Sequence, residues 1–250
     1  MRALVTTACE LPDGGDTKTL SGWCLVDALT HCATANDGTL LPLIRKAGPP
    51  THFLGKENWI GDGNDSFRSL CRTVIAQLLA DKAARTIYSK LLAVAGSSSP
   101  NSNLTPSSIL AIAAREDVEN ELRKPVGLSN AKCNCILKLA ELFQSGMLSD
   151  NLLMKTSDES AVRERLLQIK GLGPWTVDMF MLFARHSPNV FPVGDLVFRR
   201  GTAEVFGIKG SAKGGELCSK KDLQKMLDAH APFHPYRSIS AYYMYKAKGT

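Results

Sequence analysis

The sequence lacks the marks of a membrane protein and of a secreted protein. No apolar run reaches the roughly 18 residues that a membrane-spanning helix requires. The N-terminal residues hold one arginine and no long apolar stretch, so they do not resemble a secretory signal. Charged residues make up 22% of the 250 residues and hydrophobic residues 44%, which excludes a disordered chain. We therefore expect a folded, intracellular protein.

Metal-ligating residues are few and poorly spaced. The chain has 7 Cys and 5 His. Cys133 and Cys135 lack the second pair that a zinc site needs, and Pro232 interrupts the helix that would align His230 with His234. The cysteines do not cluster as in an iron–sulfur loop. We expect reduced thiols, and no metal or other cofactor.

Apolar residues follow a helical spacing along most of the chain. Over 66–80 they recur every three or four positions, as on a helix with one buried face. Strand-type alternation is scarce, so the sequence predicts an all-α fold. Further helices are predicted at 81–95, from 106 after an N-cap at Thr105, at 130–144 after Ser129, up to 168 after Ser157, and at 174–185, 195–205, 221–229 and 236–246. The Gly-containing stretches 96–103 and 210–215 predict flexible loops.

The densest motif is a Gly-x-Gly turn between two predicted helices, at residues 166–177. Gly171 and Gly173 add no Cβ between the backbone and an incoming partner, and Pro174 starts the next helix. Free N–H groups at that helix start favour a phosphate. The alternative is a plain corner between two helices, with Gly as the C-cap. In either case Leu172 would plug the space between the helices.

A carboxylate follows about twenty residues later. Asp195 ends the Pro/Gly loop at 191–194 and starts a predicted helix. It is therefore a helix N-cap, or a carboxylate that faces a cleft and is kept ionised by the helix N-terminus. Further on, Tyr236, Arg237 and three more tyrosines up to 245 fit either core packing or nucleic-acid binding.

Several blocks, in this order, resemble the helix-hairpin-helix base-excision DNA glycosylases. The hairpin at 169–176 and the loop at 192–195 look like the 3-methyladenine DNA glycosylase II branch, and the stretches 148–150 and 179–183 resemble its eukaryotic, plant-like members most. The blocks 67–84, 127–132 and 235–238 are similar to the same branch, and the resemblance covers about 38–248. It implies two helical subdomains flanking a DNA-binding cleft that Asp195 faces. The expected segments are 1–65, packing with the C-terminal subdomain; 66–165, a central helical subdomain; and 166–250, with the hairpin, catalytic loop and last helices.

Position 175 decides the subclass that the resemblance implies. Bifunctional relatives carry a lysine two residues after the second Gly, and its amine attacks the sugar. Here that residue is Trp175, whereas Lys170 lies on the other side of the turn. The resemblance thus implies a monofunctional glycosylase that hydrolyses the N-glycosidic bond of alkylated purines such as 3-methyladenine and 7-methylguanine. The alternatives are a glycosylase of the same superfamily that has another substrate or is bifunctional, with AP lyase activity, and a non-catalytic DNA-binding module.

The resemblance also assigns the chemistry and the base pocket to particular residues. Asp195 would stabilise the cationic sugar and orient the water. Trp175, Tyr245 and Met179 would line the pocket of the flipped base, where electron-rich rings suit a cationic purine. Tyr245 stands where the bacterial enzyme has Trp, and Met179 where it has Tyr.

DNA contacts form the remaining part of the implied site. Gln77 and Leu78 would be the wedge that enters the base stack, although Leu78 also lies on the apolar stripe of 66–80 and fits the core equally well. The phosphate-binding residues would be Lys170, Gly171, Leu172, Gly173 and Thr176.

The expected partner is double-stranded DNA with alkylated bases, bound by a monomer in the nucleus if the source is a eukaryote and in the cytoplasm otherwise. Lys and Arg total 30 against 24 Asp and Glu. Residues 196–250 carry 10 of the basic and 4 of the acidic side chains, which is the whole net charge of +6. Candidates for phosphate contacts there are Arg199, Arg200, Lys209, Lys213, Lys220, Lys221 and Arg237.

Overall fold

The computed structural model describes residues 18–19, 21–54, 59–61, 65–96, 104–115 and 117–248. These residues are helical or irregular apart from one isolated bridge between Lys18 and Cys24, which confirms the all-α class. None of the helices described is both long enough and apolar enough to cross a membrane. The chain divides into two units, Glu57–Arg185 and Met1–Lys56 with His186–Thr250.

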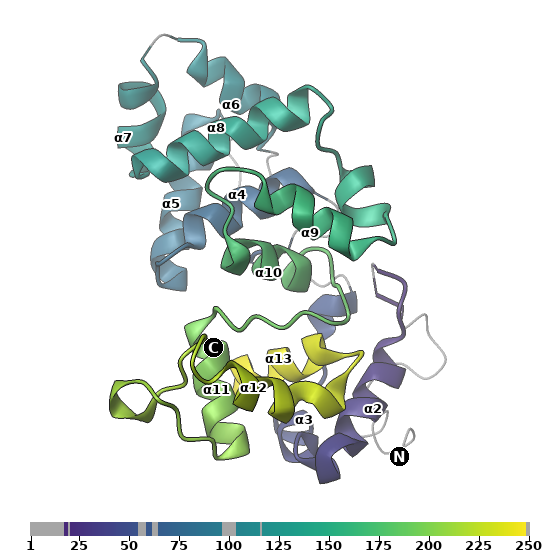
Figure 1. Cartoon of the computed structure of the whole chain (residues 1–250). Helices are drawn as coiled ribbons and strands as arrows, with labels where there is room; N and C mark the ends of the chain where they lie inside the picture. Colours follow the sequence, from purple (N-terminus) through teal and green to yellow (C-terminus); the bar gives the residue numbers. More distant parts are fainter. Residues whose placement is uncertain are drawn as a thin grey trace. The chain divides into compact units, whose positions relative to one another are not determined.

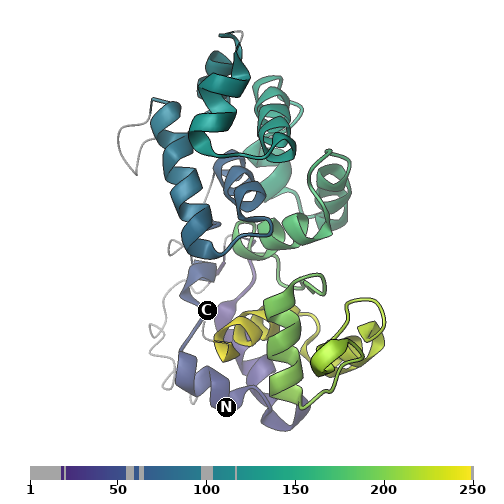
Figure 2. The same cartoon turned by 90° about the vertical axis from the view of Figure 1, so that its left-hand side faces the viewer.

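The unit Glu57–Arg185 is built around helix α4, which contacts α5, α8 and α10 (Figures 1 and 2). Its α4 residues Leu70, Cys71, Val74 and Ile75 are fully buried, as the apolar stripe predicts. The elements are α4 (Ser66–Ala76), α5 (Asp81–Val94), α6 (Pro106–Ala113), η2 (Glu119–Arg123), α7 (Lys124–Val126), α8 (Asn130–Gln144), η3 (Asn151–Lys155), α9 (Glu159–Leu167) and α10 (Pro174–Phe183).

Side chains cap the helix starts largely where the sequence predicts them. Thr105 accepts a hydrogen bond from the Ser108 N–H, and Ser129 accepts one from Lys132. The predicted cap at Ser157 is wrong by one residue, because Asp158 accepts the N–H of Ala161 and α9 begins at Glu159. The predicted loop at 96–103 lies outside the described residues, except for Gly96.

Helix α4 ends four residues before the predicted end at Ala80. Its last residue is Ala76, and the following chain turns sharply, with Leu78 at a positive φ of 58°. A new helix, α5, starts at Asp81. The apolar spacing continues past the real helix end, so periodicity alone overestimates the helix.

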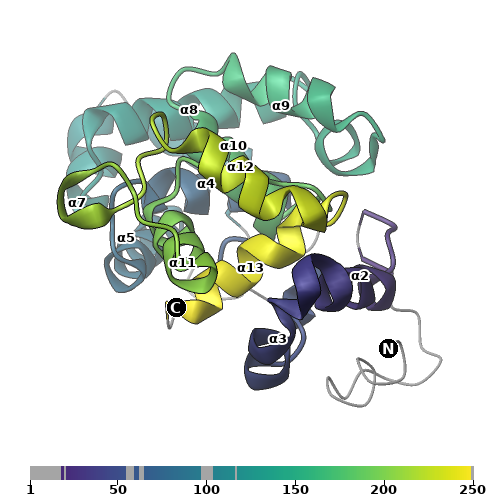
Figure 3. The ribbon, with the colours of Figure 1, turned by 60° about the horizontal axis from the view of Figure 1, so that its bottom comes forward.

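The second unit packs α11 against α13 (Figure 3). A Cβ added at Gly201 on α11 would lie 2.2 Å from the carbonyl oxygen of Met244 on α13, so only glycine permits this approach. The elements are α2 (Leu25–Gly38), α3 (Leu41–Ala47), η1 (Thr51–Leu54), α11 (Leu196–Phe206), η4 (Lys213–Gly215), α12 (Leu223–His230), η5 (Ala231–Phe233) and α13 (Arg237–Ala247).

The stretch at 210–215, predicted as a flexible insertion, is a hydrogen-bonded loop. Its backbone closes through Gly210 N–H to the Gly215 carbonyl, at 2.8 Å. The buried carboxylate of Asp222 accepts the N–H and hydroxyl of Ser211 and the N–H of Cys218, each at 2.8 Å. These hydrogen bonds hold the pKa of Asp222 well below its usual range. One carboxylate therefore organises this loop, which glycine content alone does not reveal.

Candidate DNA-binding hairpin and catalytic carboxylate

The Gly-x-Gly hairpin is a tight turn between α9 and α10. Leu172 donates its N–H to the Ile169 carbonyl at 3.0 Å, and its side chain is buried as predicted. Lys170, Gly171 and Gly173 are exposed. Among the described residues, no side chain caps the start of α10, where Gly173 is the N-cap. An exposed turn followed by an uncapped helix start can accept a phosphate.

Both the backbone conformation at position 171 and a neighbouring side chain require glycine there. The φ of Gly171 is 102°, and an added Cβ would lie 2.8 Å from both Cβ and Sγ of Cys135 on α8.

Burial raises the pKa of the Cys135 thiol to about 11, so this thiol is a packing group rather than a nucleophile. Cys133 is also buried, and the described residues contain no cluster of three or more His, Cys, Asp or Glu suited to a metal.

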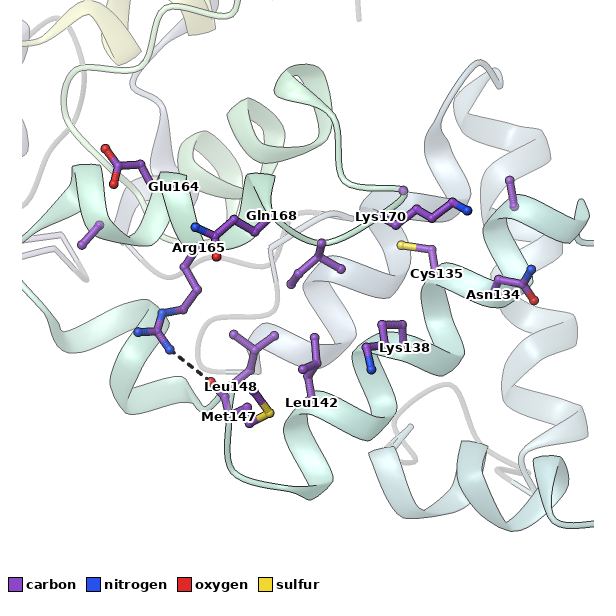
Figure 4. Close-up of a pocket in the computed structure, with 14 residues that line it drawn as sticks. Asn134, Cys135, Lys138, Leu142, Met147, Leu148, Glu164, Arg165, Gln168 and Lys170 are labelled. Carbon is purple, nitrogen blue, oxygen red and sulfur yellow. Dashed lines mark hydrogen bonds between the residues drawn. The ribbon is translucent and has the colours of Figure 1, made fainter.

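A groove of about 1190 Å³ lies beside the hairpin, between α8 and α9. Figure 4 shows Lys170 near Cys135 at one end, and Arg165 reaching the Met147 carbonyl at the other. Leu142 and Leu148 add to its apolar lining. The groove contains Lys170 and Gly171 from the predicted site, but neither Trp175 nor Met179 lines it.

Gln77 connects the turn after α4 to the hairpin. Its Nε2 donates to the carbonyl of Gly171 at 2.9 Å and to the hydroxyl of Thr176 at 2.8 Å. Thr176 is buried, so its hydroxyl serves this internal contact. The resemblance implies that Gln77 belongs to the wedge and that Thr176 binds a phosphate. In the structure, the side chains of these two residues form a hydrogen bond with each other.

Leu78 is fully exposed, with a relative accessibility of 103%. The interpretation of Leu78 as a core residue is therefore wrong. The helix that would have turned it inward ends at Ala76, and the positive φ of Leu78 directs the chain away from the helix path. The next residue, Leu79, is also exposed, so the turn after α4 presents two apolar side chains on the surface.

Trp175 and Met179 lie one helical turn apart on α10, in the same unit as the hairpin. Trp175 is half-buried, whereas Met179 is buried. Met179 can therefore support Trp175 from within the protein more readily than it can face a ligand. Tyr245, the third predicted pocket residue, lies on α13 in the other unit and is also half-buried.

Asp195 is the N-cap of α11, as one of the two interpretations predicts. Its Oδ1 accepts the N–H of Phe198 at 2.8 Å, and its side chain is only 8% exposed. The cap fixes the orientation of the carboxylate, and the helix dipole favours its negative charge. Capping and a catalytic role are therefore compatible in this geometry.

The guanidinium of Arg199 fixes the loop that leads to Asp195. It donates to the carbonyls of Val193 at 3.1 Å, Gly194 at 2.8 Å and Leu217 at 2.9 Å. The sequence suggested Arg199 as a phosphate contact, but its Nε and Nη1 donate to backbone carbonyls of the protein. The sequence around an arginine in the first turn of a helix does not show whether its guanidinium binds backbone carbonyls or a phosphate.

The other C-terminal cations separate into two groups. Arg200 pairs with Glu216, and Arg237 donates to the Asn189 side chain at 2.7 Å and lies over the Phe191 ring. Arg237, like Arg199, is bound within the protein, whereas the Arg200–Glu216 ion pair lies on the surface and contributes little to stability. The remaining candidates are exposed lysines on the loops around α12: Lys209, Lys213, Lys220 and Lys221.

Comparison with known proteins agrees with these features. Residues 71–227 match the HhH-GPD superfamily of base excision DNA repair proteins, and the chain belongs to this superfamily. It is 28% identical over 182 residues to DNA-3-methyladenine glycosylase 1 of Schizosaccharomyces pombe, covering 73% of this chain and 72% of that protein.

Two solved structures resemble this fold closely. The 3-methyladenine DNA glycosylase Mag1 of S. pombe, in complex with abasic DNA, superposes with a TM-score of 0.68 at 25% identity, over 88% of this chain and 95% of that one. The DNA-3-methyladenine glycosidase of Bacillus halodurans gives a TM-score of 0.65 at 27% identity, with 89% of each chain covered.

Proposed function

We propose that this chain is a monofunctional DNA glycosylase of the 3-methyladenine II type. It removes alkylated purines, such as 3-methyladenine and 7-methylguanine, from double-stranded DNA in base excision repair. The names of the relatives above and the superfamily membership support this activity. We expect it to act as a monomer, and in the nucleus if the source is a eukaryote.

The observation that carries the proposal is the exposed Leu78 tied to the exposed hairpin by Gln77. A base must leave the stack before its glycosidic bond can be reached. An apolar side chain that enters the stack stabilises the opened DNA, and a nearby phosphate grip holds the backbone. Leu78 and the turn around Gly171 supply these two parts in one structural unit.

The reaction requires one carboxylate and one water. Alkylation at N3 or N7 leaves the purine with a positive charge, so the base departs with the electron pair of the C1′–N bond. Asp195 would stabilise the cationic sugar, and a water would add at C1′ and release a proton. The low exposure of Asp195 strengthens this electrostatic interaction.

Trp175 and Tyr245 are the proposed contacts of the cationic base. Each is half-buried, so part of each ring is accessible. Stacking of a cation on such a ring contributes about 0.5–2 kcal/mol. We assign Met179 to the support of Trp175. Because residue 175 is not lysine, no amine at this position can form a Schiff base with the sugar.

The test is base release from N-methylated duplex DNA, with strand nicking measured in the same samples. We expect free 3-methyladenine and 7-methylguanine, intact strands until alkali is added, and no covalent complex after borohydride treatment. Borohydride trapping of a protein–DNA adduct would contradict monofunctional hydrolysis. DNA binding without release from any alkylated substrate would support the non-catalytic alternative.

A further inference from the structure

The backbone of Leu78 has a conformation that leucine rarely adopts unless contacts of neighbouring residues hold it. It has a φ of 58° and is fully exposed, so its side chain gains no packing inside the protein. The left-handed region is disfavoured for residues that carry a Cβ, and bulky side chains adopt it rarely. Contacts of neighbouring residues must therefore hold the turn in this shape.

Lys132 supplies one such contact from α8. Its ammonium group donates to the carbonyls of Ile75 and Gln77, both at 2.8 Å. These carbonyls lie at the C-terminal end of α4, where a helix leaves its last acceptors unsatisfied and favours a cation. Lys132 is half-buried, and this partial burial lowers the pKa of its ammonium group from the usual value.

Gln77 supplies the second contact. Lys132 binds the main-chain carbonyl of Gln77, and the side-chain amide of Gln77 donates to the Gly171 carbonyl in the hairpin turn and to the Thr176 hydroxyl in the first turn of α10. Gln77 directly precedes Leu78. The residue before the exposed leucine is therefore fixed through its backbone to α8 and through its side chain to the hairpin.

We infer that Lys132 and Gln77 are positioning residues that fix Leu78 at a set distance from the phosphate-binding turn. This inference rests on the proposed function. When the hairpin binds the DNA backbone, Leu78 already has the conformation in which it reaches the base stack. Preorganisation of this kind affects base flipping more than it affects binding to undamaged DNA.

The experiment measures base flipping separately from excision. A duplex with 2-aminopurine beside an abasic-site analogue reports unstacking by its fluorescence at saturating protein, and no bond is cleaved. The variants are Lys132→Met, Leu78→Ala and the double variant. Lys138→Met is the matched control, because Lys138 is an exposed α8 lysine paired with Glu141. Lys132→Arg tests rescue.

We expect Lys132→Met to lose most of the fluorescence increase and about tenfold in single-turnover base release, with the Kd for undamaged DNA within about twofold. In the Leu78→Ala background the same substitution changes neither quantity further, because Lys132 acts through Leu78. Lys132→Arg restores at least part of the signal, and Lys138→Met behaves as wild type.

A different pattern overturns the inference. If Lys132→Met lowers flipping by the same factor with and without Leu78, the lysine has only a general structural role. Gln77→Glu provides a second test should Lys132→Met fold poorly, because its carboxylate would oppose the Gly171 carbonyl; unchanged flipping in Gln77→Glu would also refute the coupling. Normal flipping by wild type without any base release would refute the proposed activity, not this inference.

Discussion

Arg199 offers a sharp test because two roles for it predict opposite results. It is either a phosphate contact, as its place in the basic C-terminal region suggests, or the support of the loop before Asp195. The structure favours the second role, since the guanidinium donates to the carbonyls of Val193, Gly194 and Leu217. The informative substitution is Arg199→Met, which keeps the aliphatic stem and removes the donors.

The magnitude follows from the hydrogen bonds that are lost. A hydrogen bond to a charged group contributes about 1.5–3 kcal/mol when buried, and less here because Arg199 is partly exposed. We expect a loss of about 2 kcal/mol in the free energy of unfolding. Release of the Val193–Gly194 backbone also lets Asp195 move. A shift of about 1 Å in a catalytic group costs about 100-fold in rate.

The assay compares single-turnover base release with the salt dependence of DNA binding. For Arg199→Met we expect a rate about 10- to 100-fold below wild type, with an unchanged slope of log K against log salt. Lys221→Met is the matched control, since Lys221 is an exposed cation of the same region. It should lower the slope by about one unit at most and leave the rate at saturating protein unchanged.

The opposite pattern would refute the loop-support role. If Arg199→Met weakens binding and lowers the salt slope while base release at saturation stays at the wild-type rate, Arg199 contacts phosphate.

Two further predictions address the hairpin and the core. Gly171→Ala should destabilise the fold by about 1–3 kcal/mol, because φ is 102° and its Cβ would meet Cys135. Gly173→Ala has open space and should leave unfolding unchanged but weaken DNA binding; equal unfolding free energies of the two variants would contradict this difference. Burial, together with the charge of Arg237, lowers the pKa of His230 to about 3, so the neutral ring stabilises the fold above pH 6.5 and this stabilisation is lost as the pH falls towards 3. Between pH 7.5 and 5.5, His230 should lower the free energy of unfolding, measured by urea denaturation, by about 1.4 kcal/mol. His230→Gln should remove this contribution. An unchanged pH dependence of the unfolding free energy in the variant would refute the assignment.

Local patterns predicted most of the helices because their signals are short-range. Apolar spacing found the buried face of α4, and capping residues marked the starts of α6 and α8. The end of α4 was missed because the apolar spacing continues past Ala76, and the tertiary contact at the helix end has no local signal. Lys132, far along the chain, takes the last carbonyls of the helix, and nothing near Ala76 signals this.

The hairpin turn and the helix cap of the candidate site could be predicted from residue types and their order, whereas the internal contacts could not. The turn around Gly171 and the cap at Asp195 follow from glycine, proline and aspartate in a recognisable order. The roles of Gln77 and Arg199 depend on which distant backbone atoms they reach. A sequence pattern cannot distinguish an arginine that binds carbonyls from one that binds phosphates.

The central claim is that Asp195 performs the chemistry, and Asp195→Asn tests it most directly. Asparagine is as good an N-cap as aspartate, so the hydrogen bond from Phe198 is kept and only the charge is lost. Asp158→Asn, at the N-cap of α9, controls for the same change away from the site. We predict that Asp195→Asn keeps its affinity for abasic DNA and its stability within about 1 kcal/mol, and loses at least about 100-fold in single-turnover release of alkylated base, while Asp158→Asn keeps the wild-type rate. Base release by Asp195→Asn at the wild-type rate would contradict the claim and leave Asp195 as a helix cap only.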